Sequence, residues 1–391
     1  MGSIPFDIIP CSRAQVVIVD VRAIILVGGC RVEGSERLGN VPIGLLDVLG
    51  EPILQRVINR LEKFGISGTA VVTEVSPSAA FLAPGSVHPA RWMEGSGTQF
   101  WRSVETAFND FAQNGAELVL VIRVGAYAEL DYEELVQYHL DAGCRVTSVV
   151  DSEGEPLDTF VISASRRNDA AYLFRHELQE MRVPCENFRF SGYVNKLRDA
   201  RDLRLLALDG FSGIAQLPPR GTELKPGVWI GEGARVHKSA RLLAPCFIGA
   251  NSRVRATAVM TRGSVAEHHS HIDCGTVVEN ASILSSTVLG AGLDVAYSVV
   301  GFRRIWNLRR AVEVEITDSQ LVGQLRSAPL RMLGDAAQVA ITLVSSLTPR
   351  FFRRNKERTG VPDASCPSSE HAPEDNLGAT DLLSARRYGN E

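Results

Sequence analysis

Residues 230–284 decide the fold of the C-terminal half and read IGEGARVHKSARLLAPCFIGANSRVRATAVMTRGSVAEHHSHIDCGTVVENASIL. An apolar side chain recurs here every six residues without a slip. These positions are Ile230, Val236, Leu242, Ile248, Val254, Met260, Ala266, Ile272, Val278 and Leu284. Four residues after each of the first nine comes a small side chain. The small residues are Ala234, Ala240, Cys246, Ser252, Ala258, Ser264, Ser270, Thr276 and Ser282.

A triangular coil of three short strands explains both series. Each strand points one apolar side chain into the core, and only a small side chain fits near each corner. Stacked coils then bury a core that no single coil could bury alone. A β-sandwich with coincidental spacing is the alternative, but sandwich strands are spaced unevenly, at roughly 8–12 residues. We therefore predict a left-handed parallel β-helix over residues 218–323, with a one-residue slip after Leu284 to Leu289 and Val295.

The N-terminal half alternates strand and helix patterns. Short runs rich in β-branched residues predict strands over 16–21, 23–27, 69–73, 117–122 and 145–150. Apolar residues at helical spacing, with capping residues, predict helices over 51–64, 98–111 and 131–142. This alternation predicts an α/β domain over residues 1–217, with a doubly wound, mostly parallel sheet and helices on both faces. A Pro- and Gly-rich stretch over 210–227 separates it from the coils.

The last part of the chain has two pieces. Residues 324–358 combine an amphipathic helix with a basic run, and residues 359–391 have the composition of a disordered tail. The segment from Leu330 to Arg358 leaves two alternatives open. It packs on the protein, or it makes a peripheral contact with the inner face of an anionic membrane.

Composition excludes several classes of protein. The 391 residues carry a net charge of −4, which offers no basic field for nucleic acid. Seven Cys without a CxxC pair argue against a zinc ribbon and against a disulfide scaffold. No basic leader with an apolar core opens the chain, and no apolar run is long enough to span a membrane. We expect a cytoplasmic protein that binds no nucleic acid.

The order of parts resembles the sugar-1-phosphate nucleotidylyltransferases, and the trailing β-helix resembles the mannose-1-phosphate guanylyltransferases among them. AIILVGGCRVEGSERLGNVPIGLLDVLGEPILQRVINRL, residues 23–61, is similar to the family's LAGGxGTRLxPLTxxxPKP loop and the LLPVxGKPLL segment after it. GSGTQFWRSVETAF, residues 95–108, is similar to its LGTAGAL motif. SGYVNKLRDARDLRLLALDG, residues 191–210, is similar to GYWxDIGTPEDYLxAN. The resemblance covers about residues 20–320.

The resemblance implies nucleotidyl transfer from an NTP to a sugar 1-phosphate, for which cations and Mg²⁺ offset the growing negative charge on the phosphates. The matching positions lack these groups. Gly, Thr and Arg of the loop fall on Arg31, Val32 and Glu33, and the Lys of PKP falls on Ile43. The two metal-binding Asp residues fall on Gly125 and on Lys196, or on Asn195 if the register is one residue off.

The resemblance leaves four candidate nucleotide-binding residues, Gly28, Gly29, Gly97 and Thr98, although a bare strand-to-helix turn and a Thr N-cap explain them equally well. We predict no catalytic residue, no metal ligand and no cofactor. The predicted function is a catalytically inactive, sugar-nucleotide-binding regulatory or scaffold subunit that forms homo- or hetero-oligomers through its β-helix.

The alternative function is an active enzyme. It is either a nucleotidylyltransferase that needs Mg²⁺ or an acyltransferase that uses a histidine of the β-helix as general base. The sequence HHSH places His268, His269 and His271 at one predicted corner. A solvated corner explains the same three residues without any activity.

Overall fold

The computed structural model describes residues 19–28, 37–39, 41–66, 68–74, 91–95, 97–164 and 186–325. All of these residues belong to one compact unit of the chain. The predicted helix and basic run from Leu330 to Arg358, and the tail over 359–391, lie outside the described residues. No helix in the described ranges is long and apolar enough to cross a membrane.

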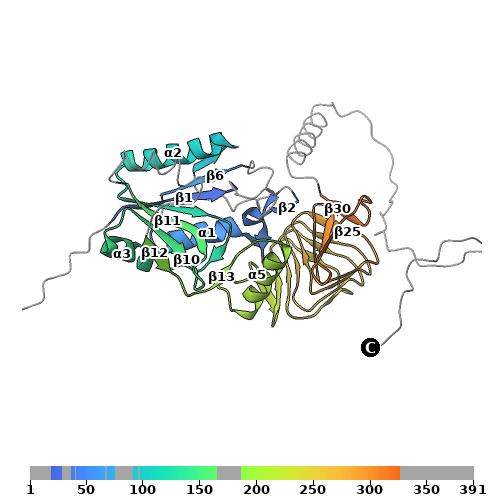
Figure 1. Cartoon of the computed structure of the whole chain (residues 1–391). Coiled ribbons are helices and arrows are strands. Elements are labelled where there is room, and N and C mark those ends of the chain that lie inside the picture. Colours follow the sequence, from blue (N-terminus) through green and yellow to red (C-terminus); the bar gives the residue numbers. More distant parts are fainter. Residues whose placement is uncertain are drawn as a thin grey trace, which may run out of the picture. The chain divides into compact units, whose positions relative to one another are not determined.

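A seven-stranded mixed sheet organises the N-terminal half (Figure 1). Its order is β12-β10-β11-β8-β1-β6-β7, and every pairing is parallel except the two that β11 makes. The strands are β1 (Val21–Val27), β6 (Gly68–Thr73), β7 (Arg91–Glu94), β8 (Leu118–Arg123), β10 (Val146–Val150), β11 (Pro156–Ser163) and β12 (Glu186–Arg189). The antiparallel β11 was not predicted. Of the predicted strand over 16–21, residues 16–18 lie outside the description, and Val21 begins β1.

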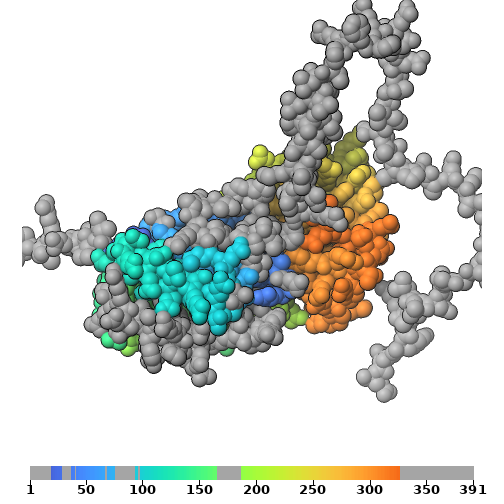
Figure 2. All heavy atoms as spheres, turned by 90° about the horizontal axis from the view of Figure 1, so that it is seen from above, coloured from blue at the N-terminus to red at the C-terminus, as the bar shows by residue number. Residues whose placement is uncertain are grey.

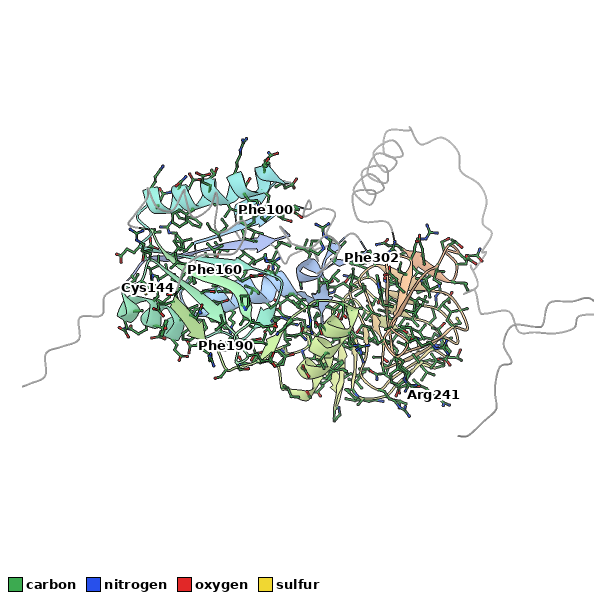
Figure 3. The ribbon with its side chains drawn as sticks, in the orientation of Figure 1. Phe100, Cys144, Phe160, Phe190, Arg241 and Phe302 are labelled. Carbon is green, nitrogen blue, oxygen red and sulfur yellow. The ribbon has the colours of Figure 1, made fainter. Side chains whose placement is uncertain are left out.

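Helices cover both faces of this sheet, as predicted. Alternate side chains of β1 enter two separate cores, with Ile25 on one face and Ile24 on the other. α1 (Ile53–Lys63) and α3 (Tyr132–Ala142) pack on the first face, and α2 (Thr98–Gln113) packs on the second. Figure 2 shows α2 in cyan at the molecular surface, and Figure 3 shows Phe100 beneath it, toward the sheet.

The capping residues predicted for α3 have the expected geometry. The Asp131 carboxylate accepts from the N–H groups of Glu133 and Glu134, and Gly143 ends the helix at a φ of 61°. His139 on α3 is buried, with Nδ1 2.8 Å from Thr147 Oγ1. Burial lowers the pKa of His139, so this residue packs as a neutral ring.

Short elements connect the sheet to the rest of the chain. Three pairs are antiparallel: β2 (Arg37–Leu38) with β3 (Val41–Pro42), β4 (Asp47–Val48) with β5 (Glu51–Pro52), and β9 (Tyr127–Ala128) with β13 (Val194–Asn195). A single 3₁₀ turn, η1 (Ile43–Leu45), lies between β3 and β4. The helix predicted from residue 51 therefore begins two residues later, because Glu51 and Pro52 form β5.

The C-terminal half consists of stacked coils whose short strands form three sheets. One contains β14 (Thr222–Lys225), β15 (Val228–Ile230), β18 (Cys246–Ile248), β21 (Ser264–Ala266), β24 (Ser282–Ile283), β27 (Ser298–Gly301), β28 (Arg304–Asn307) and β29 (Val312–Glu315). The second contains β16 (Arg235–Val236), β19 (Arg253–Val254), β22 (His271–Ile272), β25 (Thr287–Leu289) and β30 (Val322–Gln324). The third contains β17 (Arg241–Leu242), β20 (Val259–Thr261), β23 (Val277–Glu279) and β26 (Asp294–Ala296).

Strands one coil apart pair in parallel. Arg235 lies opposite Arg253, an offset of 18 residues, which is three of the six-residue periods in the sequence. Later coils are one residue shorter, since Ala266 lies opposite Ile283. The core side chain is therefore Ile283, and the prediction of Leu284 is wrong by one position. Leu284 instead packs in the core that the coils share with the α/β half. The left hand of the coil stays a prediction.

The two halves meet through one continuous core. Phe247, Val265, Leu284 and Val299 of the coils belong to the same buried cluster as α1 and the sheet. α5 (Ala200–Ser212) adds a polar anchor, because buried Arg204 donates to the Gly263 carbonyl at 2.6 Å, to Asn280 Oδ1 and to Ser282 Oγ. Burial lowers the pKa of Arg204 to about 10.

Candidate functional site

The carboxyl ends of three parallel strands lie in register at one edge of the sheet. Val27 of β1 pairs with Thr73 of β6, and Thr73 pairs with Glu94 of β7. Gly28 and Glu74 therefore follow side by side, with the start of α2 close behind β7. Parallel α/β sheets bind ligands at this edge. The structure thus brings Gly28, Gly97 and Thr98 to the same edge, whereas Gly29 lies outside the described residues.

The backbone conformation at position 28 favours glycine. Its φ is +108°, a conformation that side chains disfavour, and a Cβ there would lie 2.8 Å from Glu74 Oε2. The Glu74 carboxylate thus occupies the space beside the glycine turn.

Glu74 lies at this edge of the sheet, and the sequence analysis did not single it out. Its carboxylate lies 2.7 Å from Arg37 Nη2, and both side chains are partly exposed. A carboxylate at this edge repels phosphate, and its partner Arg37 offsets that repulsion. The available signal was position alone, because Glu74 directly follows the strand predicted over 69–73.

The N-terminus of α2 begins at a glycine. Gly97, with a φ of +53°, is the N-cap and has no side chain of its own to cap the helix. Thr98 is the first helical residue and is exposed, so the alternative of a Thr N-cap is wrong. The unpaired N–H groups and the helix dipole make such an end attractive to an anion. A ligand at the sheet edge would meet these groups.

Ile43, at the position matched to the Lys of PKP, is part of the hydrophobic core. Ile43 begins η1 and is 1% exposed. It packs with α1 and the sheet in the first core. Arg31, Val32 and Glu33 lie outside the described residues.

The two positions matched to metal ligands are brought close together. Tyr127 of β9 pairs with Asn195 of the antiparallel β13, so Gly125, two residues before Tyr127, and Lys196, one residue after Asn195, lie beyond the same end of this pair. The Lys196 ammonium lies 2.5 Å from Glu155 Oε2 and 3.1 Å from Asp151 Oδ2. The hydrogen bond to Glu155 raises the pKa of Lys196. A glycine and an ion-paired ammonium do not fit Mg²⁺, which binds carboxylate and water oxygens.

Asn195, the other candidate for the second metal position, has a structural role. It is 5% exposed, and its amide donates to the Asp202 carbonyl at 2.9 Å. Its Oδ1 accepts from the N–H of Leu197 at 3.0 Å. Across the ranges that the structure describes, no three His, Cys, Asp or Glu side chains converge on a metal position.

The three histidines of the predicted corner do not share one site. His268 is 8% exposed, so a solvated position is wrong for it. Its Nε2 lies 2.8 Å from the Gly50 carbonyl oxygen, and its Nδ1 accepts from the Ala250 N–H at 3.1 Å. Because both nitrogens are engaged, His268 has none left for an acyl acceptor. His269 and His271 line a separate pocket on the β-helix.

A buried carboxylate next to His268 also joins the two halves, and the sequence analysis missed it. Glu267 accepts from the N–H groups of Leu49 and Gly50, each at 2.8 Å. Burial raises the pKa of Glu267 to about 7, and the nearby Asp47 carboxylate adds to the shift. A sequence signal existed, because Glu267 interrupts a column of glycines, Gly231 and Gly249, at 18-residue spacing.

Comparison with known proteins adds little to this geometry. No protein-family model matches the chain, and no curated protein matches it. Among solved structures it is similar to HddC from Yersinia pseudotuberculosis, determined in complex with GMP-PN. The two share 16% identity over 48% of this chain and 98% of HddC, with a TM-score of 0.37. The proposal for this chain therefore rests on its own motifs and geometry.

Proposed function

We propose that this chain is a catalytically inactive, nucleotidyltransferase-like protein that binds a sugar nucleotide and serves as a regulatory or scaffold subunit in nucleotide-sugar or polysaccharide metabolism. The observation that carries this proposal is the ion-paired Lys196. It stands where the resemblance implies a metal-binding Asp, and its ammonium is held by Asp151 and Glu155. A positively charged Lys therefore stands where nucleotidyl transfer would need a metal-binding carboxylate.

Buried Ile43 supports the same conclusion, since it stands where a Lys would meet the phosphates. Losing one group that stabilises transition-state charge costs about 10²–10³ in rate. Losses within one catalytic unit are not additive, but ordinary turnover without both the Lys and the metal site is not expected. The N-terminus of α2 at Gly97 and the Gly28 turn support retained binding of an anionic nucleotide.

A pyrophosphate-release assay tests inactivity. The full chain is given Mg²⁺, several NTPs and several sugar 1-phosphates, and we expect no release. Turnover of about 1–10³ s⁻¹, ordinary for an enzyme, contradicts the proposal.

Titration calorimetry tests binding. GDP-mannose and other sugar nucleotides are titrated with and without Mg²⁺, and we expect binding that Mg²⁺ does not change. No heat with millimolar ligand leaves only the scaffold role.

A further inference from the structure

One face of the β-helix carries a column of basic side chains. Arg235 of β16 lies opposite Arg253 of β19, and Arg253 lies opposite His271 of β22. Arg255, two residues beyond Arg253, donates from Nε to His271 Nε2 at 3.2 Å. Adjacent strands are about 4.8 Å apart, so Arg235 and Arg253 place two positive charges on neighbouring strands. The column is therefore a concentrated positive charge on one sheet face.

This charge has no counter-ion within the described ranges. Arg235 and Arg253 are exposed and make no ion pair with any residue there. Arg262, on another sheet of the coils, does form an ion pair, with Glu279 at 2.6 Å. Like charges directly opposite each other destabilise a sheet. The positive charge of Arg235 and Arg253 would therefore attract an anion that is not part of the described residues.

The column forms the wall of a pocket, which we name the arginine pocket. Its volume is about 300 Å³, at the lower end of the range for small-molecule sites. It is lined by Gly233, Arg235, Asn251, Arg253, His269, Ser270, His271 and Leu325. Partial burial lowers the pKa of His271, with Arg255 and Arg253 adding to the effect and Asp273 opposing it. The lining thus combines two fixed charges with several hydrogen-bonding groups.

We propose that the arginine pocket binds a phosphorylated small molecule, with Arg235 and Arg253 on its phosphoryl oxygens. A guanidinium presents its N–H groups in a planar fork that matches phosphate oxygens. Two stacked guanidinium groups match the charge of a phosphate dianion, whereas one carboxylate would neutralise only half of it. This site is separate from the edge at Gly28 and is independent of whether a nucleotide binds there.

Pyrophosphate is the first probe. It is titrated into the full chain by calorimetry at fixed ionic strength, for wild type, R235Q, R253Q and the double variant. We expect each single variant to bind at least tenfold more weakly. The control is R241Q, because Arg241 is exposed on a different sheet of the same coils (Figure 3). We expect R241Q to bind like wild type.

Two outcomes overturn the proposal. Affinity of the double variant equal to wild type shows that the column does not bind phosphate. An equal loss in R241Q shows that only net charge matters. Circular dichroism and thermal melting of each variant verify the fold, and these exposed positions are expected to tolerate Gln.

Further ligands define the chemistry. Glucose 1-phosphate and a nucleoside diphosphate distinguish a sugar phosphate from a nucleotide as the source of the phosphoryl group. Citrate tests for any small polyanion, and binding of citrate as tight as pyrophosphate contradicts phosphoryl recognition. E74Q changes only the sheet edge, so pyrophosphate binding that responds to E74Q and not to R253Q assigns the anion to the nucleotide edge instead.

Discussion

The Nε2 of His268 lies 2.8 Å from the Gly50 carbonyl oxygen, which ties the second half of the chain to the first. The neighbouring Glu267 binds the two N–H groups beside that carbonyl. These contacts are buried, and water does not compete for them. The β4–β5 turn is therefore joined to the coils by three buried hydrogen bonds, which link the two halves within one compact unit.

The buried carboxyl of Glu267 predicts a pH-dependent stability. The folded chain keeps its proton up to about pH 7, whereas the unfolded chain releases it near pH 4.5. Its contribution to the free energy of unfolding is fully present below pH 4.5 and is lost as pH rises to about 7. We expect wild type to lose roughly 1–3 kcal/mol between pH 5 and 8 relative to E267Q.

Urea unfolding at the two pH values measures this difference. E232Q is the matched control, because Glu232 is exposed on an earlier coil, and it should keep the wild-type dependence on pH. Asp47 and His268 are the charged neighbours of Glu267, and both are present in the wild type and in the control. The same pH dependence in E267Q and wild type would refute the assignment.

Arg204 predicts a second effect on stability. R204A leaves the Gly263 carbonyl and Asn280 without their buried donor and opens a cavity between α5 and the coils. We expect a loss of about 2–4 kcal/mol in the free energy of unfolding, measured in urea. R201A, an exposed arginine on the same helix, should lose less than about 1 kcal/mol. Equal losses in both variants would mean that the buried contacts of Arg204 contribute nothing.

The repeating parts of the fold could be predicted from the sequence because they are periodic. Every apolar residue of the six-residue series from Ile248 to Val278 is buried in the core of the coils, as predicted. It failed at Leu284, where a shorter coil brings Ile283 inward and the α/β half covers Leu284. A local pattern contains no information about a neighbour that packs on the outside of a coil. The antiparallel β11 was missed for the same reason, since pairing direction depends on topology.

The candidate site could be predicted only in part. Gly28 and Gly97 lie at one edge of the sheet, and nucleotide binding by them stays a prediction. Glu74, Arg37 and Glu267 were missed, because each acts through a partner distant in sequence. Glu74 meets Arg37 across 37 residues, and Glu267 meets Leu49 across 218. No spacing rule links such residues before the chain folds.

Glu74 predicts a gain of binding. E74Q removes a negative charge from the sheet edge at Gly28 and leaves the Arg37 guanidinium without its carboxylate partner, so that it can bind a phosphate. Because the pair is partly exposed, we expect a gain of about 1 kcal/mol, or roughly fivefold tighter binding of a sugar nucleotide at low salt. Calorimetry measures the affinity, and E133Q on α3 should leave it unchanged. Weaker binding by E74Q would show that the carboxylate contacts the ligand favourably.

Ile43 predicts that the missing Lys cannot simply be restored. I43K places an ammonium in a position that is 1% exposed among aliphatic side chains. We expect a loss of at least about 3 kcal/mol in unfolding free energy and no pyrophosphate release. I43L keeps the volume and should lose less than about 1.5 kcal/mol. A stable I43K variant that releases pyrophosphate would show that the site lacks only this cation.

The first coil predicts how copies of the chain associate. At the other end of the stack, the hairpin of β28 and β29 and the antiparallel β30 cover the last coils. At the first coil, β16 and β17 are edge strands within the described ranges, and Leu243 beside them is 52% exposed. Unpaired strand edges with apolar side chains favour association with another chain.

We expect light scattering to report an oligomer for wild type and a smaller mass for L243D. L321D is the control, since Leu321 is similarly exposed at 44% but lies next to the capping strand β30. A strictly monomeric wild type at high concentration, or equal masses for wild type and L243D, would place the interface elsewhere or remove it.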